Sequence, residues 1–93
     1  MGASGKTTVT FDNTVVTFAT TTVTGQTGID VSTSLAEAWV SITATANNNE
    51  DDHSFAGVSF RCTCKIIADG FDIQVFPLMG IPDGDYVINW VWN

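Results

Sequence analysis

The chain has 93 residues and a formal net charge of −7, and only 14% of its residues are charged, against about 25% in an average soluble domain. Its lysines and arginines number three, namely Lys6, Arg61 and Lys65, too few to neutralise a run of phosphates, which excludes nucleic-acid binding. The same balance disfavours an anionic membrane surface, and no stretch of about 18 apolar residues predicts a membrane span.

The first residues do not look like part of a strand. Residues 1–6 contain Gly2, Ser4 and Gly5 and lack the apolar core of a signal peptide. We therefore expect a flexible lead-in over residues 1–6, followed by a single domain over residues 7–93. The protein is expected to be synthesised in a host cytoplasm without a signal peptide.

A repeated tripeptide follows in a threonine-rich region that favours strands. Val9–Phe11 recurs as Val16–Phe18, with Asp12 and Asn13 between the two copies. Because Asp and Asn tolerate left-handed backbone, the segment fits a two-residue hairpin. An edge strand followed by an extended segment fits nearly as well, and the sequence does not separate the two.

The middle of the chain carries two alternating patterns that predict strands. Apolar and polar residues alternate over Ala38–Ala46 and again over Val58–Ile66, separated by the polar segment Asn47–His53, which we expect to be a loop. In the first pattern Trp39 falls on the outward face. The only stretch that we expect could be helical is Ser34–Trp39, which is too short to alter the fold class.

The last third continues the strand pattern. Asp69 and Gly70 predict a turn, a strand follows from Phe71 to Pro77, and Ile81–Gly84 predicts another turn before a strand over Asp85–Trp92. Six to seven short strands with frequent turns predict an all-β fold, a small antiparallel β-sandwich.

The closing strand is apolar on both faces. One face carries Tyr86, Ile88, Trp90 and Trp92, and the other carries Val87 and Val91, with Asn89 between them. A strand that is apolar on both sides is covered on both sides. We therefore predict that Val87 and Val91, together with the outward Trp39, form an interface with another copy of the chain or with a partner protein.

Catalytic constellations are absent from the sequence. The chain has one histidine, His53, in the polar segment, which we interpret as a solvated loop residue because no nucleophile and orienting group accompany it. Cys62 and Cys64 share a strand face and continue an apolar pattern, so we expect buried free thiols rather than half of a zinc site. No enzymatic activity and no cofactor are expected.

Two groups of carboxylates raise a calcium hypothesis. Glu50, Asp51 and Asp52 are consecutive, and Asp83 and Asp85 flank Gly84. Calcium takes 6–8 converging oxygens, commonly from alternate residues of one loop, and consecutive acidic residues point in different directions. Solvated turn carboxylates are therefore favoured over calcium ligands, and no metal site is expected.

The pattern from Ala38–Ile42 through Gly70 and Phe71 to Tyr86–Trp92 resembles the H-type lectin domain. That resemblance implies a six-stranded antiparallel sandwich that forms homotrimers with sugar sites near subunit boundaries, and similar modules occur in phage tail fibres. The sugar-binding arginine, aromatic residue and histidine of the family are not matched by Ala56–Val58 and Phe76–Gly80.

From these observations we expect a non-enzymatic structural protein of a phage virion surface. It would decorate or cement the capsid or tail as a homo-oligomer, a homotrimer if the resemblance holds, through contacts with itself and with other virion proteins. The alternative is a carbohydrate-binding, lectin-like tip of a tail fibre that recognises a host surface glycan through Trp39, with Asn47–Asp52 as a polar rim.

Overall fold

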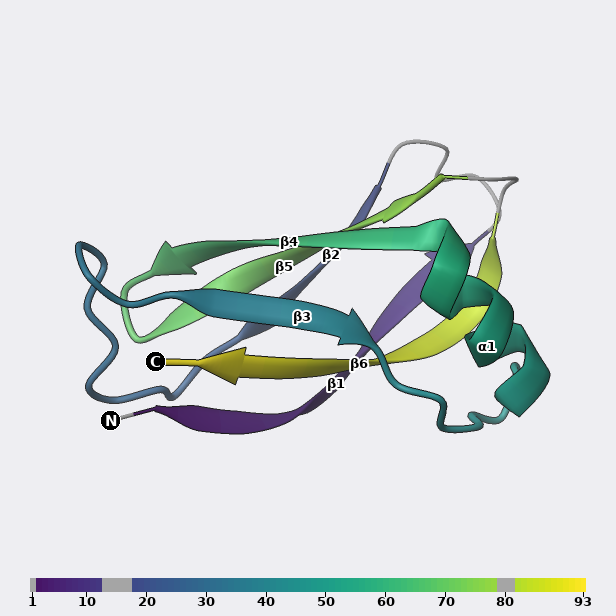
Figure 1. Cartoon of the computed structure of the whole chain (residues 1–93), viewed down its shortest axis with the longest axis horizontal. Helices are drawn as coiled ribbons and strands as arrows, with labels where there is room; N and C mark the ends of the chain where they lie inside the picture. The colour runs from purple at the N-terminus through teal and green to yellow at the C-terminus, as the bar shows by residue number, and fades with distance from the viewer. Residues whose placement is uncertain (1, 13–17, 79–81) are drawn as a thin grey trace.

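A computed structural model describes residues 2–12, 18–78 and 82–93. The described residues form six strands and one helix, arranged as two antiparallel sheets (Figure 1). In chain order the elements are β1 (Ala3–Asp12), β2 (Ala19–Val23), β3 (Ala36–Val40), α1 (Glu50–Ser59), β4 (Phe60–Ile67), β5 (Gly70–Pro77) and β6 (Asp83–Trp92).

Each sheet has three strands. One, here the β6 sheet, has the order β1-β6-β3, and the other, the β5 sheet, has the order β2-β5-β4. This arrangement confirms the predicted all-β antiparallel sandwich. Successive residues of a strand point to opposite faces, so each sheet turns one set of side chains toward the other sheet.

The core is supplied mainly by the two central strands. Both strands alternate in sequence as predicted, and their inward residues are buried in the described structure. β1 adds Val9 and Phe11, which are each 1% exposed. The buried residues of β5 and β6 are Phe71, Ile73, Val75, Tyr86, Ile88, Trp90 and Trp92.

The expectation of a flexible lead-in is wrong for Ala3–Lys6, which are the first residues of β1 and pair with the end of β6. Gly5 lies opposite Trp90, and a Cβ atom added there would come within 2.6 Å of the indole Cζ2. Glycine at this position therefore serves close packing against an aromatic ring. Both described ends of the chain lie at the same end of the sandwich (Figure 1).

The hairpin interpretation of Val9–Phe11 and Val16–Phe18 falls partly outside the described residues, and the described residues of β1 and β2 lie in different sheets. β1 is an edge strand that pairs with β6, while β2 pairs with β5. Asn13, Val16 and Thr17, which belonged to that interpretation, lie outside the described residues.

The one described helix is not where we expected helix. Ser34–Trp39 is largely extended, since β3 begins at Ala36. The segment predicted as a loop and as the start of a strand instead forms α1, and β4 begins only at Phe60. The strand predicted over Ala38–Ala46 ends at Val40.

A capping box explains where α1 begins. The side chain of Asn49 accepts the Asp52 N–H at 2.8 Å, and the Asp52 carboxylate accepts the Asn49 N–H at 3.0 Å. Two N–H groups that the helix leaves unpaired are thereby satisfied. Glu50, Asp51 and Asp52 also place negative charge in the first turn, where the helix dipole favours it.

Candidate functional site

The outer face of the β6 sheet, here called the contact face, carries the residues predicted to form an interface. In antiparallel strands paired residues share a face, and Val91 lies opposite Ser4 of β1 and Glu37 of β3. The next row along the strands is Lys6, Asn89 and Trp39. The contact face is therefore built from three strands, with β6 in its middle.

Apolar side chains on the contact face are open in the single chain. The Trp39 side chain is 48% exposed and Val91 is 37% exposed, while Val87 is half-buried. Leu35, just before β3, is 76% exposed. These side chains point outward, as the alternation along the strands predicts. That they contact a partner stays a prediction.

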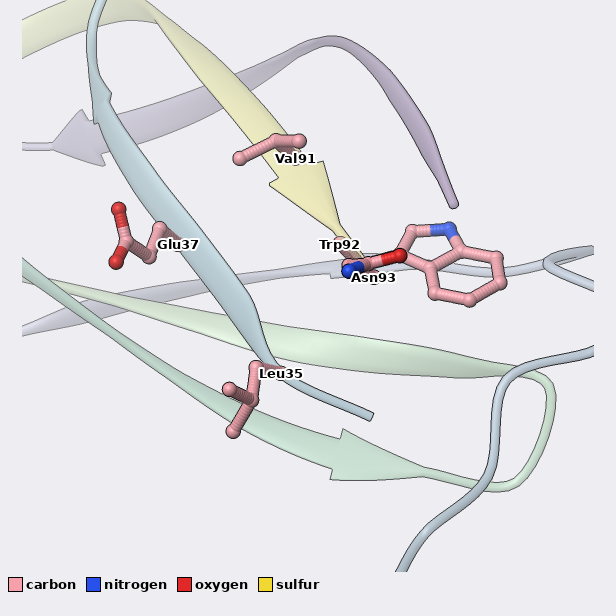
Figure 2. Close-up of a pocket in the computed structure, with 5 residues that line it drawn as sticks. All are labelled: Leu35, Glu37, Val91, Trp92 and Asn93. Atoms are coloured by element: carbon pink, nitrogen blue, oxygen red, sulfur yellow. The ribbon is translucent and has the colours of Figure 1, made fainter. Parts of the chain in front are cut away.

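One hollow lies at the end of the contact face nearest the C-terminus. Leu35, Glu37 and Val91 line it together with Trp92 and Asn93 (Figure 2). Leu35 and Asn93 exchange two backbone hydrogen bonds of 2.9 Å, which continue the pairing of β3 with β6 beyond Ala36. This pairing holds the exposed Leu35 in place beside the sheet.

A second hollow lies one row further along, beside Trp39. Ser4, Lys6 and Asn89 line it, with Gly5 and Trp90 beneath. The ammonium of Lys6 donates a hydrogen bond to the Ser41 hydroxyl at 3.3 Å. The Asn89 side chain has no hydrogen-bond partner among the described residues, which leaves an amide donor and acceptor free at the centre of the face.

The opposite side of the sandwich differs in character. The outer face of the β5 sheet carries mainly threonines and charged or amide side chains, and Thr22 donates a 2.7 Å hydrogen bond to Asp72 across the β2–β5 pair. An apolar exception lies at its end, where the Phe18 and Phe76 ring centroids are 5.2 Å apart. Exposed apolar side chains therefore lie along the contact face, at Leu35, Trp39 and Val91, whereas at the β5 sheet they lie at one end, at Phe18 and Leu78.

His53 closes the sheet edge where β3 ends, and the prediction of a solvated loop histidine is wrong. Its side chain is 0% exposed. The Ser41 N–H donates to the Val87 carbonyl at 2.8 Å, but the Ser41 carbonyl accepts the N–H of Thr43. The Val87 N–H donates instead to His53 Nε2 at 3.1 Å. A side chain thus replaces the missing strand as the acceptor.

The second ring nitrogen fixes the tautomer of His53. Nδ1 lies 2.9 Å from the Asn49 carbonyl, which can only accept, so Nδ1 carries the proton and Nε2 accepts from Val87. Both nitrogens are therefore committed to structural hydrogen bonds. This arrangement leaves the imidazole no free nitrogen for general acid or base chemistry.

Asn48 performs the same task nearer the start of β6. Its side-chain oxygen accepts the Asp85 N–H at 2.7 Å and its amide donates to the Asp83 carbonyl at 3.2 Å. Gly84 has a φ of 106°, and a Cβ there would lie 2.1 Å from the Asn48 side-chain oxygen. The Asn-rich segment therefore seals the edge of β6 and requires glycine at position 84.

Two of the acidic residues considered as calcium ligands, Asp52 and Asp85, hold other hydrogen-bond partners. The Asp85 carboxylate accepts hydrogen bonds from Thr10 at 2.7 Å and from Asn47 at 3.0 Å, and Asp52 belongs to the capping box. Among the described residues no group of three or more His, Cys, Asp or Glu side chains is arranged to hold a metal ion.

The polar rim that we expected around Trp39 lies elsewhere. Asn47 contacts Asp85, which is four residues from Asn89, or about 13 Å along β6 at the usual rise of a strand. The neighbours of Trp39 are instead Lys6 and Asn89, which the sequence analysis did not single out. They lie beside Trp39 because β1 and β3 flank β6 in this register, which the alternation along each strand does not predict.

Cys62 and Cys64 are free thiols on the inward side of β4, half-buried rather than fully buried. Burial raises the pKa of Cys62 to about 11, and the neighbouring Cys64 adds to the shift. Burial, and then the charge of Glu37, also raises the pKa of Cys64. Both groups are protonated at neutral pH, which makes them weak nucleophiles.

No family model, curated protein or solved structure matches this chain. Within the described residues, no helix has the length and apolar character needed to span a membrane.

Proposed function

We propose that this protein is a non-enzymatic structural protein of a phage virion surface, which decorates or cements the capsid or tail as a homo-oligomer. In this proposal Val87, Val91 and Trp39 lie in its contacts with other subunits or virion proteins. The threonine-rich, lysine-poor composition and the resemblance to lectin-like modules of phage fibres support the virion setting.

The observation that carries the proposal is the open apolar surface on the contact face. Trp39 and Val91 are large exposed hydrophobic side chains in adjacent rows of one sheet. Regular strands hold them at fixed spacing, and exposed aromatic and aliphatic side chains gathered on one surface are typical of protein interaction sites. Two further observations support a non-enzymatic role. Both ring nitrogens of His53 are held in structural hydrogen bonds, and the thiols of Cys62 and Cys64 are protonated at neutral pH.

Binding to purified phage particles tests this proposal. The double variant Trp39→Thr, Val91→Thr replaces the two apolar side chains by threonine, a β-branched residue that suits a strand. The matched control for Val91→Thr is Val58→Thr, which makes the same valine-to-threonine change in α1 at a residue that is 76% exposed. We expect the wild type and the control to be recovered on particles in a fixed ratio, and the double variant to be lost. Equal recovery of all three would contradict the proposal.

A second candidate function is carbohydrate binding at the tip of a tail fibre. The hollow beside Trp39 favours it, because a half-exposed indole next to the Lys6 ammonium and the free Asn89 amide offers a stacking surface with polar groups at its rim. Glycan-array binding that is lost on Trp39→Ala would support this candidate. Recovery on particles without any glycan binding would support decoration.

A further inference from the structure

We infer that the partner on the contact face is a second copy of this chain, packed face to face about a two-fold axis that runs parallel to β6. This inference rests on the proposed function, since it names the partner at the interface proposed there. Its three arguments are the position of β6, the free amide of Asn89 and the distribution of charge across the face.

β6 is the middle strand of its sheet, with β1 on one side and β3 on the other. A two-fold axis along its outer surface therefore places β6 on the partner's β6 and places β1 on the partner's β3. Each residue of the central column, Val87, Asn89 and Val91, then meets its own equivalent. A patch that is complementary to itself is what such a contact requires.

Asn89 suits a position on the axis. Its amide is free of hydrogen bonds among the described residues and lies between two valines. An asparagine side chain carries both a donor and an acceptor, so two copies facing each other can exchange a pair of hydrogen bonds. A carboxylate or an ammonium in the same place would repel its own equivalent.

The charges on the two flanks of the face are opposite. Lys6 is on β1 and Glu37 is on β3, and neither makes an ion pair among the described residues. The two-fold arrangement places Lys6 over the partner's Trp39, where an ammonium is attracted by the ring face. Glu37 is two residues along β3 from Trp39, about 7 Å, which a lysine stem spans. Two such Lys–Glu contacts would flank the axis.

A face-to-face contact uses the same patch on both copies and closes after two. The inference therefore replaces the homotrimer implied by the lectin resemblance with a dimer. Packed sheets lie about 10 Å apart and aligned to within about 30°, a spacing that the Trp39, Val87 and Val91 side chains fill.

Charge reversal and mixing test the inference. We expect Lys6→Glu and Glu37→Lys each to weaken self-association about 10-fold or more, because each reverses two contacts per dimer. An equimolar mixture of the two variants restores pairing, since every reversed charge then faces an opposite one on the other copy. An ion pair within one chain would not be restored by mixing. The matched control is Lys65→Glu, the same charge change on the outer face of the β5 sheet.

Sedimentation equilibrium on the intact chain separates the outcomes. A dimer that is weakened by Lys6→Glu but not by Lys65→Glu, and that reforms in the mixture, supports the inference. A wild-type trimer, equal effects of Lys6→Glu and Lys65→Glu, or no rescue on mixing overturns the inference while the proposed assembly role stands. A wild-type chain that neither self-associates nor binds particles overturns both.

Discussion

The Nε2 atom of His53 accepts the backbone N–H of Val87 at 3.1 Å. This bond joins the helix to the central strand of the β6 sheet at the place where β3 turns away. It satisfies a backbone donor that would otherwise be unpaired at a buried edge, which is costly in a protein interior. The His53 side chain therefore both anchors α1 against the sheet and holds the backbone of Val87 in place.

Removing the imidazole is expected to destabilise the fold. His53→Ala leaves the Val87 N–H without its acceptor and opens a cavity in a fully buried site. The Asn49 carbonyl loses the imidazole donor and keeps the backbone N–H of residue 53. We expect a loss of about 2–4 kcal/mol in the free energy of unfolding, measured by urea denaturation. His53→Gln should lose less, because its side-chain oxygen can accept from Val87. A loss below about 0.5 kcal/mol for His53→Ala, the range of an ordinary surface substitution, would contradict this account.

Two glycine-to-alanine variants should have opposite effects. At Gly84 the positive φ and the nearby Asn48 oxygen oppose a Cβ, so Gly84→Ala should cost about 2 kcal/mol or more. Gly57 lies in α1 with nothing within 4 Å of its added Cβ. Gly57→Ala should stabilise by about 0.5–1 kcal/mol through helix propensity. Thermal unfolding measures both, and a Gly84→Ala variant as stable as the wild type would refute the assignment of Asn48 to the β6 edge.

The buried thiol predicts a pH dependence. Because the pKa of Cys62 rises from 9.0 to about 11 on folding, the native state holds the proton where the unfolded chain begins to release it. This contribution to stability is complete below pH 9 and is lost as the pH rises toward 11. We expect the free energy of unfolding to fall between pH 9 and about 11, and to fall less in Cys62→Ser.

The wild type must be compared with Cys62→Ser because Tyr86 also lowers the stability of the fold at high pH. Burial, followed by the charges of Asp52 and Asp83, also raises the pKa of Tyr86, which gives a loss of stability of the same sign at high pH. Only the difference between wild type and Cys62→Ser reports on the thiol. Identical slopes for the two proteins would show that Cys62 is not desolvated as the structure indicates.

The two central strands could be predicted from the sequence because large apolar residues occupy every second position without interruption. Ile73 and Val75, like Ile88 and Trp90, alternate with polar or outward residues, and both sets are buried as expected. The two-sheet architecture follows from such strands, since each must bury one face. The inward half of the closing strand was therefore predictable from the sequence alone.

The sequence analysis missed the helix because a short segment can fit two patterns at once. Apolar residues every two positions indicate a strand, and apolar residues every three to four positions indicate a helix. Val58 and Phe60 appeared to begin a strand, yet Val58 is an exposed residue of α1. Asn49 followed three residues later by Asp52 was the available signal for a helix start. His53 then lies one turn into α1, which explains its burial against β6.

The contact face was only half predictable. Alternation places Trp39, Val87 and Val91 on outward positions, but it does not say which strands lie side by side. Lys6 and Asn89 join Trp39 only because β1 and β3 flank β6 in a particular register. That register depends on contacts between residues far apart in the chain, such as Gly5 against Trp90.

The molar mass of the wild-type chain in solution tests the central claim most directly. A monomer has a mass of 9.9 kDa, and light scattering behind size-exclusion chromatography resolves it from a dimer. We predict a molar mass of about twice that of the monomer at micromolar concentration, because the face-to-face dimer buries Trp39 and Val91 on both copies. A monomer mass across that range would show that the open apolar surface of the β6 sheet is not a site of self-assembly.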